Sequence, residues 1–276
     1  MRTALTIAGS DPSGGAGIQA DLKTFAAFGL YGASAITAIT VQSTRGVEAV
    51  APLSADLVTA QIEAVAADLA ILATKVGMLG TAAIVEAVAA AIAELDLPLV
   101  VVDPVLVSSS GERLLDAEGV QALCLELFPR ALVVTPNIPE AEALSGRRIA
   151  SSDDAREAAR RIHGMGAAAV VVTGGHARWD DQGSGTVSER AAHVVDRLFD
   201  GREFHEFRVA RVDSRQTHGT GCTFAAAVAA GLALGQALPD AVARAQQYVA
   251  GAIAHAPGIG HGRGPLDHFW GGILKQ

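Results

Sequence analysis

The residues best suited to chemistry lie in a glycine turn at residues 216–223 (QTHGTGCT), directly before an apolar run at residues 224–234. Gly219, Thr220 and Gly221 stand where a helix is expected to begin. The first four N–H groups of a helix lack partners and carry the positive end of its dipole, so this turn favours a bound phosphate. Cys222 lies on the same turn, where we expect its thiol to lose a proton more readily.

Two other interpretations of this turn remain open. A glycine-flanked helix start that carries a buried cysteine would show the same residues. His218 precedes Cys222 by four residues, which leaves a cysteine hydrolase as an alternative function. Such a nucleophile needs a neighbouring base and a third group that orients the base, and the sequence alone identifies neither. The 8 histidines and 2 cysteines show no spacing typical of a metal site.

Further polar residues follow expected strands. Gln42 ends an apolar segment, and its amide offers both a donor and an acceptor to the edge of a heteroaromatic ring. Met78 follows a second apolar segment and could flank such a ring. Asn137 and Glu140 follow a third segment and Asp103 a fourth, where their oxygens could hold a hydrated Mg²⁺ ion. Each of these residues is also common as a strand end, a core residue or a helix cap.

The elements that position these residues alternate between strand-like and helix-like patterns. We predict strands at residues 4–8, 35–41, 71–76, 99–102, 131–135 and 168–173. We predict helices at residues 18–28, 55–69, 82–95, 116–128, 140–144, 152–165, 224–234 and 239–255, with Ser54 and Thr81 as caps of the second and third. The more polar residues 183–211 predict antiparallel edge strands with a hairpin turn at Asp200 and Gly201.

Repeated strand–helix units predict an α/β fold with a mostly parallel sheet covered by helices on both faces. Ligands of such sheets bind outside the carboxyl ends of the strands. The polar and glycine motifs fall at those ends, which predicts one site assembled from many loops. No internal repeat or linker divides the sequence, so we expect a single domain over residues 1–276.

Composition excludes several classes of function. Half of the residues are hydrophobic, 18% are charged, and the net charge is -8 with no basic tract. Nucleic acid is therefore not an expected partner, since binding it requires clustered Lys and Arg. The Ala-rich segments are too short to span a membrane, and the N-terminus lacks a signal-peptide pattern. Two cysteines cannot form a disulfide framework, which favours a cytoplasmic location.

Two nucleotide-binding motifs are disfavoured. Residues 15–20 (GAGIQA) match the dinucleotide fingerprint G-x-G-x-x-G/A. The first glycine of this match lies several residues beyond the expected strand, and the next strand ends at Gln42 rather than at an acidic residue that could hold a ribose. A phosphate loop of the G-x-x-x-x-G-K-[ST] type is absent, because no Gly-Lys pair occurs.

Together these motifs resemble the hydroxymethylpyrimidine/phosphomethylpyrimidine kinases of thiamine biosynthesis. The resemblance rests on residues 8–24 (AGSDPSGGAGIQADLKT), 74–79 (TKVGML), 135–140 (TPNIPE) and 217–223 (THGTGCT), and it extends nearly end to end. The C-terminal region also resembles this family at Gly260, Gly262, Gly264, Pro265, His268 and Phe269. The first and last motifs are long and specific.

The resemblance implies a ribokinase-like three-layer fold and an ATP- and Mg²⁺-dependent kinase. Its substrates would be 4-amino-5-hydroxymethyl-2-methylpyrimidine and then the monophosphate of this compound. The family is expected to form homodimers. The resemblance also implies that Gln42 hydrogen-bonds the aminopyrimidine, with five residues around the ring: Gly9, Ala16, Asp21, Met78 and Val105.

For the phosphates, the resemblance implies an anion hole formed by Gly219, Thr220 and Gly221. Cys222 stands where sugar kinases of this fold place an aspartate base. Magnesium and the ATP phosphates would be held by Asn137 and Glu140, with further charge from Asp103. The second phosphorylation acts on a phosphate monoester, whose second pKa of about 6 leaves it largely ionised at neutral pH. We therefore expect only the first step to depend appreciably on Cys222.

Two positions depart from the family pattern. Thr173, at an expected ATP-binding position, precedes the Gly-Gly-His triplet where the family commonly has lysine. Residues 108–110 are serines where a lysine is sometimes seen. An arginine from elsewhere or a second metal ion would then have to supply the missing charge.

Two rival functions remain open from the sequence. A pyridoxal kinase of the same fold also acts on a hydroxymethyl group of a substituted heteroaromatic ring. A pyrimidine-binding regulatory protein without catalysis is the alternative that Thr173 suggests.

Overall fold

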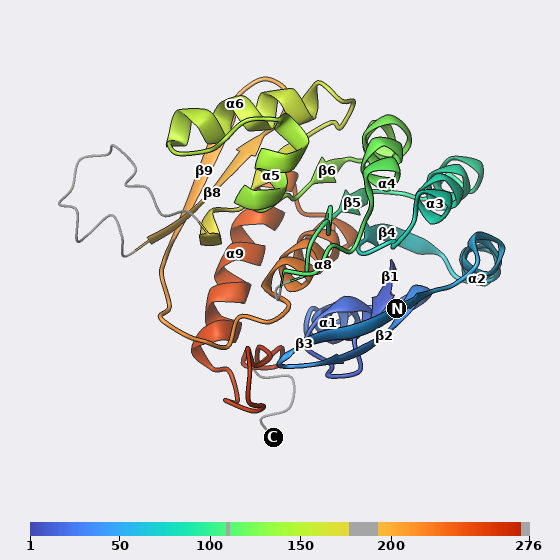
Figure 1. Ribbon diagram of the computed structural model, residues 1–276, viewed down its shortest axis with the longest axis horizontal. Helices are drawn as coiled ribbons and strands as arrows, with labels where there is room; N and C mark the ends of the chain where they lie inside the picture. Colours follow the sequence, from blue (N-terminus) through green and yellow to red (C-terminus); the bar gives the residue numbers. More distant parts are fainter. Residues whose placement is uncertain (109–110, 177–192, 272–276) are drawn as a thin grey trace.

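The computed structural model describes residues 1–108, 111–176 and 193–271. Its strands form one nine-stranded sheet in the order β3-β2-β1-β4-β5-β6-β7-β8-β9, seen in Figure 1. The strands are β1 (Thr3–Ser10), β2 (Tyr31–Ser43), β3 (Gly46–Pro52), β4 (Ile71–Val76), β5 (Val100–Val102), β6 (Val133–Val134), β7 (Val170–Val172), β8 (His193–Phe199) and β9 (Phe204–Ala210). The sheet is parallel from β2 to β7, whereas β3, β8 and β9 each pair antiparallel with the preceding strand.

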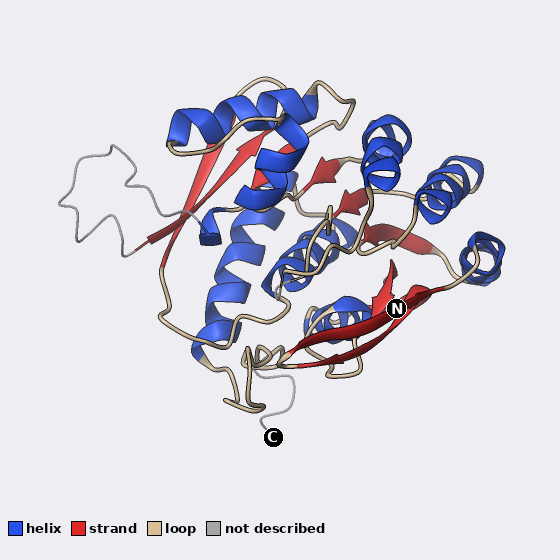
Figure 2. Cartoon of the chain, in the orientation of Figure 1, coloured by secondary structure: helices blue, strands red, loops and turns tan. Residues whose placement is uncertain are grey.

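Helices cover both faces of the sheet, which confirms the predicted three-layer α/β architecture (Figure 2). One face packs against α2 (Ala55–Asp68), α3 (Ala82–Glu94), α4 (Ala117–Ala122), α5 (Ile138–Ser145) and α6 (Ser152–His163). The other face packs against α1 (Gly17–Ala27), α8 (Thr220–Ala233) and α9 (Leu238–Ala254). A π-helical turn (Leu123–Leu127) and 3₁₀ turns (Phe128–Arg130 and Gly174–His176) complete the helical segments.

The central strands are short and rich in valine. β5, β6 and β7 are buried along their whole length and contain only valine. Such runs are typical of parallel strands with helices on both faces, because neither face needs polar side chains. Successive side chains along each strand point to opposite cores. Val102 faces the layer of α2 to α6, whereas Val101 faces the layer of α1, α8 and α9. The sheet is thereby fixed from both sides, and its carboxyl ends form a rigid edge.

The helix caps predicted from the sequence are present at the starts of α2 and α3. The Ser54 hydroxyl accepts a hydrogen bond from Leu57 N at the start of α2, and Thr81 accepts one from Ile84 N at the start of α3. These bonds satisfy N–H groups that have no partner inside the helix. Both predicted caps are confirmed.

The predicted hairpin joins β8 and β9. The Asp200 carboxylate accepts hydrogen bonds from Arg202 N and Glu203 N, and Gly201 adopts a φ of 89°. This conformation favours glycine, which explains the Asp-Gly pair. The part of the prediction that covers residues 183–192 lies outside the described residues.

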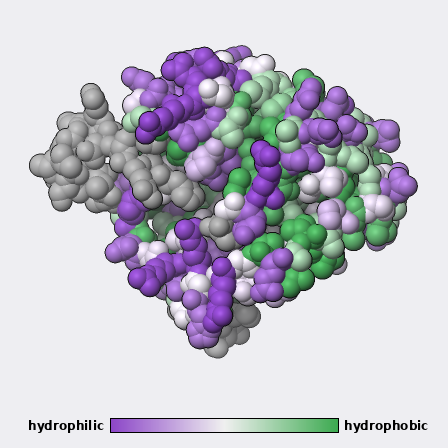
Figure 3. Space-filling model, viewed as in Figure 1, coloured by the Kyte–Doolittle hydropathy of each residue, from purple (hydrophilic) through white to green (hydrophobic). Residues whose placement is uncertain are grey.

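The strand β3 was not predicted. Its residues are largely exposed, because it is an edge strand with a single neighbour, and it therefore lacks the apolar alternation on which strand prediction depends. With β2 it carries exposed apolar side chains, Ile39, Val41 and Val50. Figure 3 shows a hydrophobic area over these two strands and a hydrophilic surface over α6. No helix among the described residues is long and apolar enough to cross a membrane.

Candidate active site

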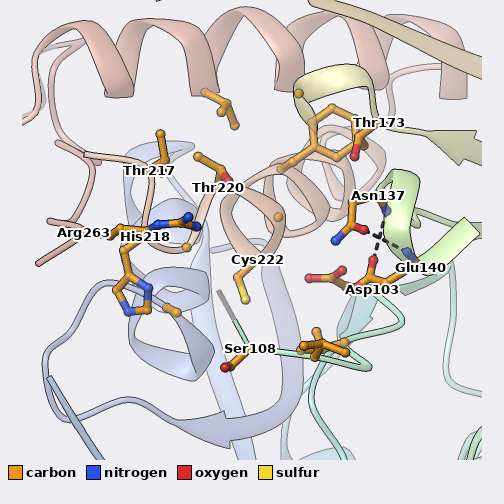
Figure 4. A pocket seen from close by; sticks show the side chains of 18 of the residues that line it. Asp103, Ser108, Asn137, Glu140, Thr173, Thr217, His218, Thr220, Cys222 and Arg263 are labelled. Atoms are coloured by element: carbon orange, nitrogen blue, oxygen red, sulfur yellow. Dashed lines mark hydrogen bonds between the residues drawn. The ribbon is translucent and has the colours of Figure 1, made fainter. Parts of the chain in front are cut away.

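A cavity of about 770 Å³ opens at the carboxyl ends of the parallel strands. It collects residues from loops that are far apart in the sequence, as the α/β topology predicts. Figure 4 shows Cys222 between His218 on one side and Asp103 and Glu140 on the other. The lining includes thirteen of the fourteen residues predicted for the site: Gly9, Ala16, Gln42, Met78, Asp103, Val105, Asn137, Glu140, Thr173, Gly219, Thr220, Gly221 and Cys222.

Asp21 is the exception, and the expected contact with the pyrimidine is corrected here. The side chain is fully buried in α1 and does not belong to the cavity lining. Its Oδ2 atom accepts hydrogen bonds from Thr6 Oγ1 at 2.6 Å and from Lys75 Nζ at 2.9 Å. Burial raises the pKa of Asp21, while the Lys75 ammonium and the Thr6 hydroxyl oppose that rise. Asp21 therefore holds a buried cation in place.

Lys75 is the cation that the sequence analysis did not assign to the site. Burial alone would favour the neutral amine, but the charges of Asp21 and Asp103 raise the pKa of Lys75 above its ordinary value. The side chain is fully buried in β4. A protonated amine there places positive charge behind the cavity wall that carries Cys222 and Asp103. A lysine inside an otherwise apolar strand was the signal in the sequence that pointed to such a role.

The glycine turn adopts a conformation suited to anion binding. Gly219 precedes α8 with φ of 82°, and a Cβ atom at this position would collide with Gly15 O. Only glycine fits both requirements. No side chain among the described residues caps the N-terminus of α8. Thr220 N donates only a long hydrogen bond, to Thr217 O at 3.5 Å. Because Thr220 and Gly221 line the cavity, the positive end of α8 lies at the space where a phosphoryl group would lie.

The expectation of an easily ionised thiol at Cys222 is wrong. Burial, together with the nearby carboxylates of Asp103 and Asp21, raises the pKa of Cys222 to about 12, although Lys75 and the Gly17 N–H favour the thiolate. The helix dipole was the basis of the expectation, but burial of the thiol, with a smaller contribution from the two acidic neighbours, outweighs its effect. Cys222 is therefore a neutral thiol at physiological pH.

The same geometry argues against a cysteine hydrolase. His218 Nε2 lies 2.8 Å from Asp11 Oδ2, and this imidazole faces the carboxylate in a buried pair. A nucleophilic cysteine needs a thiolate or a base that removes its proton. The high pKa of Cys222 and the pairing of His218 with Asp11 provide neither.

Two carboxyl groups face the cavity at the ends of β5 and β6. Burial and the neighbouring Asp103 raise the pKa of Glu140 to about 8, and burial with the charge of Asp21 raises the pKa of Asp103 to about 6 despite Lys75. Asn137 and Glu140 form a capping box at the start of α5, in which Glu140 Oε2 accepts from Asn137 N at 2.9 Å. This bond fixes the carboxylate of Glu140 near Asp103.

The donor set fits a magnesium ion. Mg²⁺ prefers one or two carboxylates and retains most of its water. Both acidic groups are buried, and Asp103 raises the pKa of Glu140. A cation on the cavity side would favour their charged forms. A methyl group built on Gly221 would lie 3.7 Å from Asp103 Oδ2, so this carboxylate is adjacent to the anion-binding turn. The residues that would hold the ion are Asp103 and Glu140, with Asn137 beside them.

Thr173 stands at the end of β7 and pairs with Asn137 through a parallel bridge. Its N–H donates to Pro136 O at 3.0 Å. The guanidinium of Arg211, which also lines the cavity, donates from Nη1 to Gly175 O at 3.0 Å. A cation is thus fixed two residues beyond Thr173.

Of the serines at 108–110, Ser108 lines the cavity, and the other two lie outside the described residues.

The opposite end of the cavity holds Gln42, Met78 and Val105. The amide of Gln42 lies between Thr40, which contacts it at 3.2 Å, and His218, which contacts it at 3.3 Å. Met78 O accepts from Thr37 Oγ1 at 2.6 Å and from Gly9 N at 3.1 Å. These bonds fix the Met78 main chain beside the cavity. An amide edge with apolar flanks is the composition expected for a site that binds a flat heteroaromatic ring.

Comparisons with known proteins agree with this site. A family profile described as phosphomethylpyrimidine kinase matches residues 11–267. A hydroxymethylpyrimidine/phosphomethylpyrimidine kinase of Bacillus subtilis is 46% identical over 266 residues, which cover 96% of this chain and 94% of that protein. A thiamine biosynthesis bifunctional protein of Geobacter sulfurreducens is 47% identical over 265 residues, and the match covers 96% of this chain but only 52% of that longer protein.

Solved structures show the same fold. A pyridoxal kinase of Bacillus subtilis, solved as an ADP complex, has a TM-score of 0.85 and 39% identity, with 97% of each chain covered. A phosphomethylpyrimidine kinase from Clostridium difficile has a TM-score of 0.76 and 39% identity, with 90% of this chain and 98% of that chain covered. The predicted ribokinase-like fold is confirmed, and this chain belongs to the phosphomethylpyrimidine kinase family.

Proposed function

We propose that this protein transfers a phosphoryl group from ATP to 4-amino-5-hydroxymethyl-2-methylpyrimidine and then to the resulting monophosphate. The observation that carries the proposal is the cavity itself, in which an uncapped helix start faces two buried carboxyl groups and a heteroaromatic-ring site. Family membership supports the same activity, because the relatives that match this chain along nearly their full length are named for it.

In this proposal the pyrimidine lies against Gln42, with Gly9, Ala16, Met78 and Val105 around the ring. The transferring phosphoryl group lies at the start of α8, where N–H groups of Gly219, Thr220 and Gly221 neutralise its charge. Phosphoryl transfer has a loose transition state, so positioning and charge neutralisation contribute more than a strong base does. The anion-binding turn therefore supplies the main catalytic effect of this chain.

The ATP phosphates would extend from α8 toward Asn137 and Thr173. Asp103 and Glu140 would hold Mg²⁺, which when bound neutralises phosphate charge. Arg211 is the residue that we propose as the substitute for a lysine at position 173, since its guanidinium is already fixed at Gly175. Lys75 adds charge from behind the wall without touching the ligand.

The proton of the hydroxymethyl group must leave during the first transfer. A thiol with a pKa of about 12 is a weak acid, so Cys222 does not rest as a thiolate base. We propose that the alcohol proton passes to Cys222 late in the transfer, as the proton of the thiol passes to the Asp103 carboxylate that accepts its hydrogen bond. The second transfer begins from an ionised phosphate monoester and requires no such step.

Pyridoxal kinase is the second candidate function, because solved pyridoxal kinases share the fold at 35–39% identity. A competition assay with the aminopyrimidine and pyridoxal at equal concentration, ATP and Mg²⁺ separates the two candidates. We expect the phosphorylated pyrimidine to dominate the products. Dominant pyridoxal phosphate would overturn the proposal, and binding of the pyrimidine without ATP consumption would support a regulatory binding protein.

Three further properties belong to this proposal. We infer that residues 1–276 form one kinase domain, because a single sheet runs through it. We infer a homodimer, for which the exposed apolar side chains Ile39, Val41 and Val50 on β2 and β3 provide a candidate surface. A cytoplasmic location is consistent with the two free cysteines, Cys124 and Cys222.

A further inference from the structure

The amide of Gln42 is held between two polar groups on opposite sides. Thr40 precedes it by two residues on β2, so both side chains lie on the same side of the strand. In the structure Oε1 of the amide accepts from Thr40 Oγ1 at 3.2 Å, and Nε2 lies 3.3 Å from His218 Nε2. A primary amide can occupy this space in two orientations that differ by a half-turn, and its neighbours decide between them.

Thr40 offers Gln42 an acceptor. A threonine hydroxyl has one proton, and Thr40 Oγ1 lies 2.7 Å from Ser10 O. A carbonyl oxygen can only accept, so this contact uses the proton. Only the lone pairs of Thr40 Oγ1 are then left to interact with Gln42. A lone pair accepts a hydrogen bond, so the amide atom next to Thr40 should be the nitrogen, which carries N–H groups.

His218 offers Gln42 a donor. Its Nε2 atom lies 2.8 Å from Asp11 Oδ2. Although burial opposes ionisation, hydrogen bonds from His218 and Ser13 lower the pKa of Asp11 to about 2, so this group is a carboxylate. Ser13, Gly15 and Ala16 also donate to it. An acceptor at 2.8 Å requires a proton on Nε2, whether or not the ring is charged. That single proton points to Asp11, and of the two ends of the amide only the oxygen can share it without bringing two N–H groups together.

Both neighbours favour one orientation, with the amide oxygen toward His218 and the nitrogen toward Thr40. The orientation with Oε1 toward Thr40 places two lone pairs together at Thr40 and two N–H groups together at His218, and such mispaired half-buried groups are unfavourable. We propose that Thr40 and the Asp11–His218 pair fix the amide of Gln42 and thereby select a ring with an amine, rather than an oxo group, beside its ring nitrogen. This inference rests on the proposed function.

The fixed amide also sets the direction of the substrate. The amine of the aminopyrimidine pairs with the amide oxygen on the His218 side, and the ring nitrogen pairs with the amide N–H on the Thr40 side. The hydroxymethyl group neighbours the amine on the ring. It therefore lies toward His218, which directly precedes the anion-binding turn at Gly219–Gly221. Reversal of the amide would turn the ring over and direct the reacting group toward Thr40, away from the turn.

The 4-oxo analogue tests this selection. Its oxo group accepts a hydrogen bond where the amine donates one, and its ring N–H donates where the ring nitrogen of the aminopyrimidine accepts. Binding of both rings, measured by calorimetry without ATP, should favour the amine by about 100-fold in the unaltered protein. Thr40→Val removes the acceptor, lets the amide rotate and should reduce this ratio at least tenfold. Thr40→Ser keeps the hydroxyl and should restore the ratio.

A second measurement does not depend on any variant. Nitrogen NMR of ¹⁵N-histidine-labelled protein should show His218 protonated at Nε2. An unprotonated Nε2 would overturn the inference, as would a Thr40→Val variant that weakens both rings equally. If the unaltered protein binds neither ring, the proposed function fails instead, and the NMR result still decides the orientation of the amide.

Discussion

At the scale of single residues, the ionisable groups in and behind the cavity wall shift one another's pKa values. Asp21 and Asp103 both act on Lys75, and Asp103 also raises the pKa of Glu140 and Cys222. The carboxyl groups and Lys75 are buried and Cys222 is half-buried, so the charges are weakly screened and a change in one group alters the others. The consequence is that Glu140 is largely protonated at neutral pH until a cation arrives, whereas Asp103 is largely ionised.

Replacement of Cys222 tests the proton step. Cys222→Ala should lower the rate of the first phosphorylation by about tenfold to a hundredfold, because a group that receives the alcohol proton is lost. The second phosphorylation should change by less than about threefold, since its nucleophile is already ionised. Rapid-quench assays that resolve both products measure the two rates. Comparable losses in both steps, with an unchanged melting temperature, would contradict a role confined to the first step.

Glu140 makes magnesium binding depend on pH. The pKa of Glu140 is raised to about 8 and that of Asp103 to about 6, and a cation binds the ionised forms. Affinity for Mg²⁺ should therefore increase as the pH rises through 6 and then through 8, and level off about one pH unit above 8. Glu140→Gln, which retains the capping acceptor, should bind more weakly and lose the upper part of this dependence. Calorimetric titration measures the effect, with the exposed Glu126→Gln as a control.

The sequence predicted where the polar residues lie better than how they behave. Strand ends located Gln42, Asp103 and Asn137 correctly, since alternating strand and helix patterns fix which loops meet. Asp21 and Cys222 were misjudged because their states depend on Lys75 and Asp103, which are distant in the sequence. Local rules such as the helix dipole apply only when no stronger charge lies nearby.

At the scale of elements, the site is formed where the ends of β5, β6 and β7 meet the start of α8. β7 leads into the Gly174–His176 turn, and Gly174 N donates to Asp196 on β8 at 2.7 Å. Asp196 also accepts from Gln246 on α9 at 2.9 Å. These bonds tie the loop after β7 to two neighbouring elements. Arg211, directly after β9, is thereby fixed against Gly175.

Arg211 and Thr173 provide a test at this scale. Arg211→Ala should raise the KM for ATP roughly tenfold, because one charge-assisted contact with phosphate is lost. Adding Thr173→Lys to Arg211→Ala should restore most of the affinity by placing a cation on the adjacent wall. Arg208→Ala, on β9 but outside the cavity lining, is the matched control. An unchanged KM in Arg211→Ala would exclude this residue as the substitute cation.

Element prediction succeeded where burial imposes a regular pattern. The buried strands and most helices lie within a few residues of their predicted positions. The edge strand β3 escaped prediction because exposed residues need no alternation. The expected helix at 116–128 contains α4 followed by a π-helical turn, a change of hydrogen bonding that apolar spacing does not reveal.

At the scale of the whole molecule, one sheet separates two hydrophobic cores. Val133, in the central strand β6, is fully buried in the core on the α8 side, and Val134 faces the other core. Because every central strand contributes to both cores, neither core can be lost without the other. The cavity lies across the edge that this arrangement makes rigid.

The chain should therefore unfold in a single transition. Circular dichroism and calorimetry should report the same midpoint, as expected for one cooperative domain. Val133→Ala should lower the free energy of unfolding by about 2 kcal/mol according to both probes. Two separate transitions, only one of which responds to Val133→Ala, would contradict the single-domain inference.

The most direct test of the central proposal is turnover of 4-amino-5-hydroxymethyl-2-methylpyrimidine with ATP and Mg²⁺, with monophosphate and diphosphate resolved. We predict that monophosphate forms first and that diphosphate then accumulates at the expense of two ATP molecules per pyrimidine. Monophosphate alone would contradict the second step. A protein that binds the pyrimidine but consumes no ATP would contradict the proposal that this cavity catalyses phosphoryl transfer.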